Sequence, residues 1–353
     1  MHALGEECPA EFFRTIVEAL SDSFDPDQAA AYEQLMTAWI PPRARVQPRL
    51  PARVDKVYVL SRVTLGADIK ITSLVLDAMK RRFPEAEVHF VGNRKSTELF
   101  AADRRVIAFE AQYPRSGPVS ERLKFAKDLS AGIVGSSSVV IDPDSRMTQL
   151  GLVPVGPIEH YFHFPSRVAS SAGNLTDLTR NWVKSTFGVE GEAYIAPEAV
   201  DPGVAGSFAA VSLGTGENDS KRLPDSFEWR LIELLGQRFE TIWIDRGAGG
   251  EEARRVTAAV EKSGAGNKVR FWEGSFAGFA SLIGQAAFYA GYDSAGQHAA
   301  AAAGTPLMTI FAGALSERFR ERWSPSGRGD IQVINADQSA PGDVLRLITF
   351  RRR

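Results

Sequence analysis

The sequence predicts an α/β protein built from two similar doubly wound domains in tandem. Its 353 residues, 44% of them apolar, are enough for two hydrophobic cores of ordinary size. Short apolar runs alternate with amphipathic stretches, which is typical of right-handed βαβ units and a parallel sheet. This alternation stops at Pro197 and an Asp-Pro-Gly turn at 201–203, and then starts again. We therefore place a first domain at 51–202 and a second at 203–353.

The first domain is expected to open on a short apolar strand. Gly66 lies in the turn after that strand, and Pro84 ends the first helix because proline cannot continue one. The expected strands are 57–60, 88–91, 106–109 and 139–141, and the expected helices are 69–82, 98–102, 122–129 and 175–187.

The second domain repeats the same pattern. Its expected strands are 209–213, 241–245, 269–271, 288–291 and 307–311, and a basic helix is expected at 342–353. Ligands bind beyond the carboxyl ends of the strands in open parallel sheets. Two such domains facing each other therefore predict one cleft between them.

Residues 1–50 do not follow the strand–helix pattern. Apolar residues recur at helical spacing within 9–40, and Pro41-Pro42 stop this region before a stiff, basic connector. The sequence predicts an N-terminal helical extension packed on the main body.

The composition excludes several classes of protein. A net charge of −2 provides no basic field for general nucleic-acid binding. The single cysteine, Cys8, excludes a disulfide framework or a thiolate zinc site. No stretch approaches the roughly 18 apolar residues that span a bilayer, and Glu6, Glu7 and Glu11 lie where a signal peptide would be basic and then apolar. We expect a cytoplasmic protein.

The segment 288–311 has the pattern of a phosphate-binding strand, turn and helix. Ser294 suits a helix N-cap, and Gly304 suits the end of the alanine-rich helix that follows. The first N–H groups of such a helix favour an anion, and His298 can donate to the same anion. Asp293 would accept from a sugar hydroxyl or hold the turn. The alternative is an ordinary strand–helix connection with a capping serine and a buried histidine.

Residues 213–224 (LGTGENDSKRLP) form a second candidate loop. Gly214 and Gly216 allow a tight turn near an anion, and Lys221 could reach a diphosphate. The loop is not a Walker A motif, because no glycine precedes Lys221 and no serine or threonine follows it. It is not a dinucleotide fingerprint either, because Asp219 stands at the third glycine position. A surface loop with a solvated lysine is the alternative.

Residues 61–70 (SRVTLGADIK) follow the first strand. Gly66 and Ala67 bring the backbone close to the expected cleft, and Asp68 lies at the start of a helix. A carboxylate in this position is either a cap that complements the helix dipole or a general base. The pattern by itself favours the cap.

Two further motifs carry weaker signals. Asp142 and Asp144 form an Asp-x-Asp after a strand, a pattern that can bind a divalent cation, but one short motif at a sheet edge does not favour a metal here. His160 and His163 lie in an aromatic run without a carboxylate or cysteine at ligand spacing. We interpret them as packing or acceptor-side residues.

Taken together, these residues resemble the ADP-heptose:lipopolysaccharide heptosyltransferases of glycosyltransferase family nine. The resemblance covers 56–335, about four fifths of the chain, and rests on three motifs. The first runs from Arg62 to Asp68, and the second is KRLP at 221–224, where the family prefers Lys-Arg-Trp-Pro. The third and most specific is the block 273–306, which follows the family pattern Asp-Ser-Gly-x-x-His-x-Ala-Ala-Ala.

The resemblance implies a GT-B fold and an inverting, metal-independent transferase that uses no cofactor. Its donor would be a nucleotide-diphosphate sugar such as ADP-heptose, and its acceptor lipopolysaccharide or another glycan, including a lipid-linked one. Asp68 would be the general base, and Arg62 and Gly66 would also line the cleft. The implied donor-binding residues are Thr215, Gly216, Lys221, Asp293, Ser294, Ala295, Gly296 and His298.

The chain departs from the family pattern at several positions. Ala295 replaces the family's glycine, with Gly296 displaced by one, and Leu223 replaces the tryptophan. The first turn reads Leu-Gly-Ala-Asp where the family usually has Leu-Gly-Asp. Three alternatives therefore stay open: a non-catalytic nucleotide-sugar-binding homologue, a nucleotide-sugar 2-epimerase and a dehydrogenase. A peripheral contact with the inner membrane through Arg346 and 351–353 is a further expectation, against a solvated basic tail.

Overall fold

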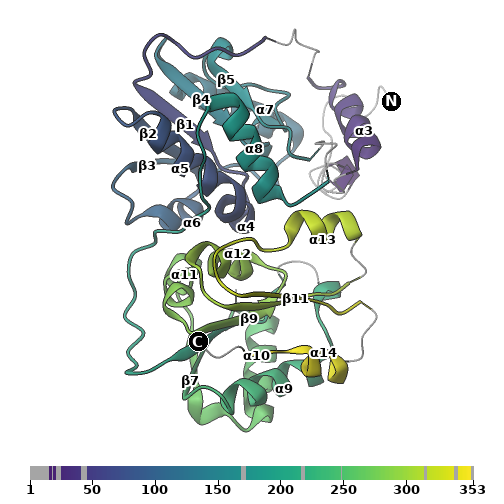
Figure 1. Cartoon of the computed structure of the whole chain (residues 1–353). Helices are drawn as coiled ribbons and strands as arrows, with labels where there is room; N and C mark the ends of the chain where they lie inside the picture. Colours follow the sequence, from purple (N-terminus) through teal and green to yellow (C-terminus); the bar gives the residue numbers. More distant parts are fainter. Residues whose placement is uncertain are drawn as a thin grey trace. The chain divides into compact units, whose positions relative to one another are not determined.

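The computed structural model divides the chain into two compact units, Met1–Ala193 and Tyr194–Arg353 (Figure 1). The boundary between the units follows Ala193, so it lies earlier in the chain than the domain boundary that we predicted after residue 202. The residues that the structure describes are 16–17, 19–20, 25–40, 46–167, 172–215, 219–247, 249–313, 316–337 and 341–350. Each unit is considered by itself.

The first unit contains a parallel five-stranded sheet in the order β3-β2-β1-β4-β5. Its strands are β1 Lys56–Leu60, β2 Glu87–Gly92, β3 Val106–Glu110, β4 Ser138–Asp142 and β5 Tyr161–His163. The first four confirm the predicted strands to within two residues. The fifth was not predicted: β5 pairs with β4 through only three residues.

Helices pack on both faces of this sheet. They are α4 Leu65–Ala67, α5 Ser73–Arg82, α6 Arg94–Thr97, α7 Val119–Gly132 and α8 Leu175–Phe187, with short turns η4 Glu98–Phe100, η5 Arg146–Thr148 and η6 Ile158–His160. A π-helical turn, η3 Asp68–Thr72, lies between α4 and α5. Such a turn accommodates one extra residue in a helix. It joins α4 to α5 without a break, so the helix expected at 69–82 is part of a continuous helical segment from Leu65 to Arg82. The helix predicted at 98–102 is confirmed in part: η4 covers Glu98–Phe100, but the helical segment begins earlier, at Arg94, and ends before 101.

The N-terminal extension is described in part. Helix α3 (Pro26–Met36) begins at Asp25, whose carboxylate accepts from the backbone N–H groups of Asp27 and Gln28. Its buried residues Tyr32 and Met36 pack in a cluster with Val119 of α7. Most of the predicted helical residues before Asp25 lie outside the described residues.

The second unit contains a parallel six-stranded sheet in the order β11-β10-β9-β6-β7-β8. Its strands are β6 Phe208–Ser212, β7 Thr241–Asp245, β8 Val269–Trp272, β9 Phe288–Tyr292, β10 Leu307–Phe311 and β11 Ile331–Asn335. All five predicted strands are confirmed, and β11 is an additional edge strand.

The helices of the second unit also cover both faces of their sheet (Figure 1). They are α9 Asp225–Gly236, α10 Gly250–Ser263, α11 Phe276–Gln285, α12 Ala295–Ala303, α13 Glu317–Trp323 and α14 Pro341–Leu347, with turns η7 Asp219–Lys221 and η8 Gly266–Lys268. Residues of α9, α10 and α14 form one core cluster with the strands, and α11 packs against α12.

The C-terminal helix is shorter than predicted. Helix α14 ends at Leu347, so the prediction of helix over 348–350 is wrong, and 351–353 lie outside the described residues. The side chain of Gln332 on β11 explains the end. Its amide donates to the carbonyl of Leu347 (2.5 Å) and accepts from the N–H of Thr349 (3.1 Å).

The strand orders locate the binding edge of each unit. Ligands bind doubly wound sheets at the switch point, where the strand order reverses direction. This point lies between β1 and β4 in the first unit and between β6 and β9 in the second. Asp68 follows β1, whereas Lys221 follows β6 and Asp293 follows β9. The sequence candidates therefore lie at the two switch points.

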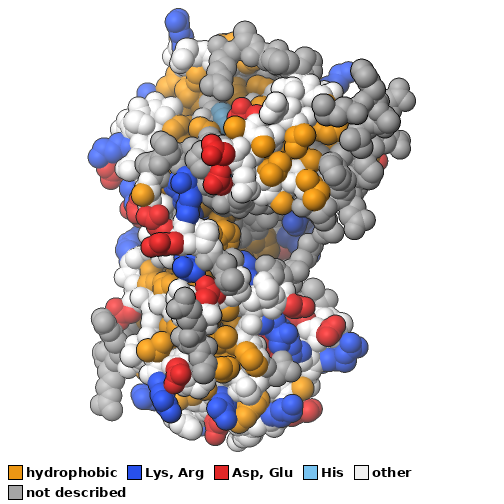
Figure 2. All heavy atoms as spheres, turned by 90° about the vertical axis from the view of Figure 1, so that its right-hand side faces the viewer, with side chains coloured by type: hydrophobic (Ala, Val, Ile, Leu, Met, Phe, Trp, Pro, Cys, Tyr) orange, Lys and Arg blue, Asp and Glu red, His pale blue; other side chains and the backbone are white. Residues whose placement is uncertain are grey.

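The surface carries charges of both signs. On the face shown in Figure 2, basic and acidic side chains are interspersed, in agreement with the net charge of −2. No helix among the described residues has the length and apolar character needed to cross a membrane.

Candidate functional site

The site in the second unit is centred on an ion pair between two segments far apart in sequence. Lys221 Nζ lies 2.7 Å from Asp293 Oδ2. Lys221 ends the η7 turn after β6, and Asp293 directly follows β9. Asp293 is 7% exposed, so its charge is largely removed from water and needs the lysine as a partner. The structure thus brings together two residues that the sequence analysis assigned to the donor site.

A buried hydrogen-bond chain supports this ion pair. The side-chain amide of Gln297 donates to Asp293 Oδ1 at 2.5 Å. Thr309 Oγ1 in turn donates to Gln297 Oε1 at 2.8 Å. Gln297 lies on α12, Thr309 lies on β10, and neither is exposed to solvent. Both oxygens of the Asp293 carboxylate are therefore held, one by a cation and one by an amide.

The N-terminus of α12 lies next to Asp293. Ser294 occupies the N-cap position, as predicted, but its side chain makes no capping hydrogen bond. Its Oγ is buried and lies near the hydroxyl of Tyr289. The first N–H groups of a helix have no partner within the helix, and together with the helix dipole they favour an anion. Lys221 adds a full positive charge beside this helix end.

Gly296 is required by close packing of α12 on the sheet. A Cβ atom at this position would lie 2.2 Å from the hydroxyl oxygen of Tyr289 and 2.7 Å from its Cζ. Tyr289 is fully buried on β9, and its ring occupies the space under the first turn of α12. Ala295, by contrast, is half-buried. Glycine is therefore needed at 296, where the ring of Tyr289 on β9 leaves no room for a side chain.

We expect Gly296→Ala to destabilise the protein by about 1–3 kcal/mol, because the new methyl group overpacks against Tyr289. Gly284→Ala is the matched control. Its Cβ would make an ordinary 3.6 Å contact with Ala303, and alanine is the better helix former. Urea denaturation of both variants measures the difference. A Gly296→Ala protein as stable as Gly284→Ala would contradict the packing argument.

Aromatic side chains of α13 flank the same site. The Phe319 ring centroid lies 5.2 Å from Lys221 Nζ, close enough for a cation–π contact. The Trp323 ring lies 5.9 Å from the ring of His298, centroid to centroid. His298 is 4% exposed, so it is buried between α12 and α13. The sequence analysis did not assign α13 to the site.

The remaining residues of the 213–224 loop differ in their burial. Thr215 is half-buried, and Gly216 lies outside the described residues. Leu223, at the family's tryptophan position, is 8% exposed and belongs to the core. Its N–H donates to Tyr292 Oη at 3.2 Å. Arg222 pairs with the buried Glu228 (3.2 Å).

Asp245 is a further candidate residue, which the sequence analysis did not include. It ends β7, the second strand of the unit, where Rossmann-like folds place the acidic residue that binds a ribose hydroxyl. Its Oδ1 accepts from the N–H of Gly247 at 3.0 Å. Burial raises the pKa of the Asp245 carboxyl. The predicted strand boundary at 245 was the available signal.

Asp68 in the first unit is buried and held by its own loop. Its carboxylate accepts from Ser61 Oγ (2.7 Å), the N–H of Arg62 (2.8 Å) and Thr72 Oγ1 (3.0 Å). Burial raises the pKa of Asp68, and the hydrogen bonds from Ser61 and Arg62 partly oppose this. Asp68 does not cap a helix N-terminus, since Thr64 precedes α4. The carboxylate instead joins the end of β1 to the π-helical turn.

Arg62 and Asp144 lie at the same switch point, and the backbone is strained there. Val63 and Asp144 both have positive φ angles, 71° and 72°. This conformation is unfavourable for a β-branched residue and is often found at functional sites. Arg62 Nη1 donates to the carbonyl of Pro143 at 3.1 Å and also to Ser166 Oγ. Gly66 lies half-buried in the α4 turn beside them.

The Asp-x-Asp motif binds protein groups. Burial by itself would raise the pKa of Asp144, but Arg167, His163 and Arg62 hold it well below its usual range. Asp142 accepts from the N–H of Ser145 at 2.6 Å and from two hydroxyls, those of Thr148 and Tyr161. Within the described ranges, no cluster of three or more His, Cys, Asp or Glu side chains could hold a metal ion.

The two histidines of the aromatic run, His160 and His163, have different hydrogen-bonding partners. His163 Nε2 lies 3.5 Å from Asp144 Oδ1, which places it at the switch point. Burial lowers the pKa of His163, but the hydrogen bond to Asp144 and the nearby carboxylates raise it overall. His160 Nδ1 lies 2.6 Å from the carbonyl oxygen of Arg49, outside this network.

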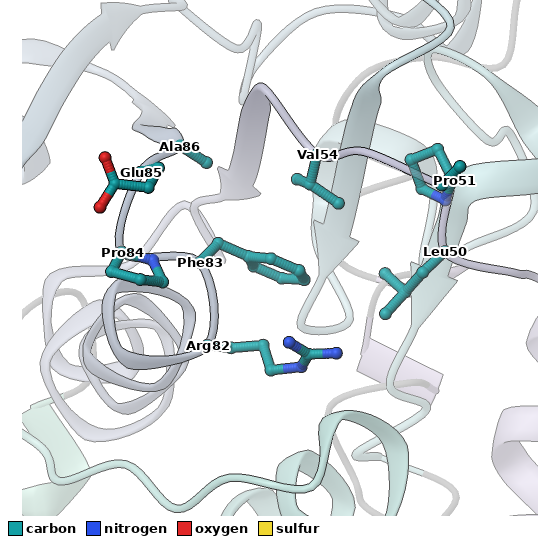
Figure 3. Close-up of a pocket in the computed structure, with 9 residues that line it drawn as sticks. Leu50, Pro51, Val54, Arg82, Phe83, Pro84, Glu85 and Ala86 are labelled. Carbon is teal, nitrogen blue, oxygen red and sulfur yellow. The ribbon is translucent and has the colours of Figure 1, made fainter.

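A shallow pocket of about 300 Å³ lies at the opposite edge of the first sheet. Figure 3 shows Leu50, Pro51 and Val54 on one side and Phe83 and Arg82 on the other. These residues precede β1 and β2 in the chain. The pocket therefore lies at the amino ends of the strands, away from the binding edge of a parallel sheet.

Comparisons with known proteins agree with this architecture. No protein-family model matches the sequence, and no curated protein matches it. Among solved structures, the chain is similar to a family-nine glycosyl transferase from Veillonella parvula, with 14% identity, a TM-score of 0.60 and coverage of 87% of this chain and 93% of that one.

Two structures from E. coli are also similar. Heptosyltransferase WaaC, solved with ADP, has 18% identity, a TM-score of 0.58 and coverage of 82% of this chain and 98% of that one. ADP-heptose lps heptosyltransferase II has 15% identity, a TM-score of 0.56 and coverage of 82% and 96%. The chain therefore has the two-unit GT-B fold of the family-nine glycosyltransferases, as the sequence predicted.

Proposed function

We propose that the protein is a glycosyltransferase that moves a sugar from a nucleotide-diphosphate donor to a glycan acceptor. The observation that carries this proposal is the Lys221–Asp293 pair at the N-terminus of α12. It combines a lysine and free helical N–H groups at the switch point of a Rossmann-like unit. The likeness in fold to a heptosyltransferase solved with ADP supports the same assignment.

The donor would bind in the second unit. Its diphosphate would lie between Lys221 and the first turn of α12, with His298 and Ser294 as further hydrogen-bond partners. Thr215, Gly216, Ala295 and Gly296 would provide the surrounding backbone. Asp245 would accept from a ribose hydroxyl, and Asp293 would orient Lys221 and face the sugar.

The chemistry would be a single displacement with inversion. The acceptor oxygen forms the new bond to the anomeric carbon while the bond to the diphosphate breaks, so negative charge develops on the leaving phosphate. Lys221 and the α12 N–H groups stabilise this charge. We propose that no metal and no cofactor are needed for this step, because the fixed donors supply the positive field.

Asp68 is the proposed base for the acceptor proton. Its raised pKa makes it a better base than an exposed aspartate. It must first exchange a hydrogen bond from Ser61, Arg62 or Thr72 for one from the acceptor hydroxyl. Arg62 and Gly66 would border the acceptor in the same unit. As parts of the same proposal, the donor sugar would be a heptose and the acceptor a lipopolysaccharide. The protein would contact the membrane peripherally.

A non-catalytic nucleotide-sugar-binding protein is the second candidate. The complete burial of Asp68 favours it, because a carboxylate held by three internal hydrogen bonds is suited to stabilising its own loop. Such a protein would bind the donor without releasing nucleotide in the presence of any acceptor. A 2-epimerase would instead isomerise the donor sugar with no acceptor added.

The binding half of the proposal is tested with ADP, UDP, GDP, CDP and their sugars in a thermal-shift screen. We expect at least one nucleoside diphosphate to raise the unfolding temperature, because a ligand that binds only the folded state stabilises it. Added EDTA should leave this rise unchanged. If none of these compounds changes the unfolding temperature, the donor-site assignment is wrong.

Replacement of Lys221 by methionine should weaken the binding of nucleoside diphosphate by about 10- to 100-fold, measured with the diphosphate that binds the wild type most tightly. This corresponds to the loss of a charge-assisted hydrogen bond worth about 1.5–3 kcal/mol. The negative charge of Asp293 is then also left without its partner. Isothermal titration calorimetry measures the change.

Lys268→Met is the matched control in the same unit. Lys268 is half-buried and donates to the carbonyl of Gly236 at 2.6 Å, and it precedes β8 at the amino edge of the sheet. The affinity of this control should equal that of the wild type. Equal affinity in Lys221→Met would remove the lysine from the donor site.

A further inference from the structure

Gln297 and Thr309 form a buried polar pair to which the sequence analysis assigned no role. Gln297 occupies a variable position of the Asp-Ser-Gly-x-x-His pattern, and Thr309 lies in the middle of an apolar strand. Both side chains have zero exposure. Buried polar groups are costly unless they are hydrogen-bonded, and a fully bonded network fixes the orientation of its members.

The Asp293 carboxylate can only accept, so the Gln297 amide nitrogen faces its Oδ1, at 2.5 Å. The Thr309 hydroxyl then donates to Oε1 at 2.8 Å and holds the other end of the amide in this orientation. A reversed amide would place its oxygen against the carboxylate and repel it. Gln297 therefore donates to Asp293, whose second oxygen is then available to Lys221.

The same amide faces His298. Its nitrogen lies 3.4 Å from His298 Nε2. An amide nitrogen only donates hydrogen bonds, so this contact is attractive when His298 Nε2 carries no proton. The arrangement favours neutral His298 with its proton on Nδ1. One glutamine thus acts on two residues of the donor site.

We infer that Thr309 and Gln297 are positioning residues of the anion site. They hold the Asp293 carboxylate, and through it the Lys221 ammonium group, beside the N-terminus of α12. They also set the tautomer of His298. The first consequence rests on the proposed function, because it concerns diphosphate binding, whereas the second is a property of the protein without a ligand.

Thr309→Val removes the hydroxyl at nearly constant volume and tests both consequences. With ADP as the probe, we expect about five- to tenfold weaker binding by calorimetry, the effect of about one lost hydrogen bond. Thr309→Ser keeps the hydroxyl and should restore wild-type affinity. Thr305→Val is the matched control, since Thr305 is also buried but donates to the Ile283 carbonyl, at 2.9 Å.

Nitrogen-15 NMR of the imidazole rings provides the second readout. The chain has five histidines, and the His298→Gln spectrum identifies the signal of interest. At about pH 8.5, well above the ordinary histidine pKa of about 6.5, wild-type His298 should show the Nδ1–H tautomer. Thr309→Val and Gln297→Met should both shift it toward the Nε2–H form, whereas Thr305→Val should not.

The two measurements distinguish a failure of the positioning role from a failure of the ADP assignment. If wild-type protein does not bind ADP but the tautomer shifts as expected, the positioning pair is supported and the ADP donor is wrong. If ADP binds equally to wild type and Thr309→Val, and the tautomer is unchanged, the positioning role is overturned. If Thr309→Val does not fold, Gln297→Met and Thr309→Ser give the same comparison.

Discussion

Asp68→Asn should reduce sugar transfer by about 10²- to 10⁴-fold, the usual contribution of a general base, and leave ADP affinity nearly unchanged. Asparagine keeps the shape of the side chain. Its oxygen can still accept from Arg62 and Thr72, and its amide group can donate to Ser61 Oγ, which already accepts from the N–H of Val63. The substitution thus removes the basic group at a cost of about 1 kcal/mol in stability.

The control for this experiment is Thr72→Val. It removes one hydrogen bond to Asp68, at 3.0 Å, and retains the carboxylate. We expect transfer in this variant to stay within a few-fold of wild type. Initial rates with the best donor from the nucleotide screen and a truncated glycan acceptor measure both variants. Retained transfer in Asp68→Asn would assign Asp68 a structural role and favour the non-catalytic candidate.

The pH dependence of stability gives an independent test of the Asp68 environment. Burial raises its pKa in the folded state above the ordinary value of 3.8. The stability contributed by this group is therefore fully present below about pH 3.8 and is lost as the pH rises through the folded-state pKa. Wild type should become less stable relative to Asp68→Asn over this rise. Urea unfolding at a series of pH values checks the sign, and a difference that grows in the opposite sense would contradict the burial argument.

The sequence predicted most of the fold because the main signals are local. Helix α8 has the predicted bounds, since Asn174 accepts from the N–H of Thr176 at its start and Gly188 takes the left-handed conformation at its end. Strands such as β9 and β10 are buried along their whole length and read as continuous apolar runs. Where the signal is tertiary, the prediction failed. Edge strand β11 is only partly buried, and β5 is recognisable only through its pairing with β4.

The site was predictable to the extent that topology brings strand ends together. Lys221 and Asp293 are 72 positions apart, and the tandem strand–helix pattern was enough to place both at one edge of the second sheet. Their support was not predictable in this way. In the sequence, Thr309 is one more β-branched residue of a strand, and only the packing of α12 on β10 shows that it donates to Gln297. Asp68 likewise lies at the start of a π-helical turn whose five residues are all buried, and the spacing of the apolar residues there does not distinguish such a turn from an ordinary helix.

Glu228 is the second position where we expect a large effect. It is fully buried on α9, and its two oxygens accept from Arg222 Nε at 3.2 Å and from Arg255 Nη1. The hydroxyl of Tyr292 also lies 3.3 Å from Oε1. This carboxylate joins three segments: the KRLP loop, α10 and the end of β9. Arg255 extends the connection to the end of β6 by donating to the Leu213 carbonyl at 3.0 Å.

Glu228→Ala should therefore destabilise the protein by about 3–5 kcal/mol, the cost of removing one partner from a buried ion pair. Arg222 and Arg255 are only 17% and 14% exposed, so two like charges would remain in a poorly hydrated site. Glu233→Ala, on the exposed face of the same helix, should change stability by less than about 0.5 kcal/mol. Urea denaturation compares the two variants.

Glu228→Ala should also weaken ligand binding at the proposed donor site, because Arg222 adjoins Lys221 in the chain. Loss of the Glu228 contact frees the KRLP loop, so ADP affinity should fall at temperatures where the variant is still folded. Glu228→Gln separates the two effects: its oxygen can still accept from Arg222, so it should restore most of the ADP affinity while remaining less stable than wild type. If Glu228→Ala binds ADP as tightly as Glu233→Ala, the buried ion pair stabilises the fold without positioning Lys221.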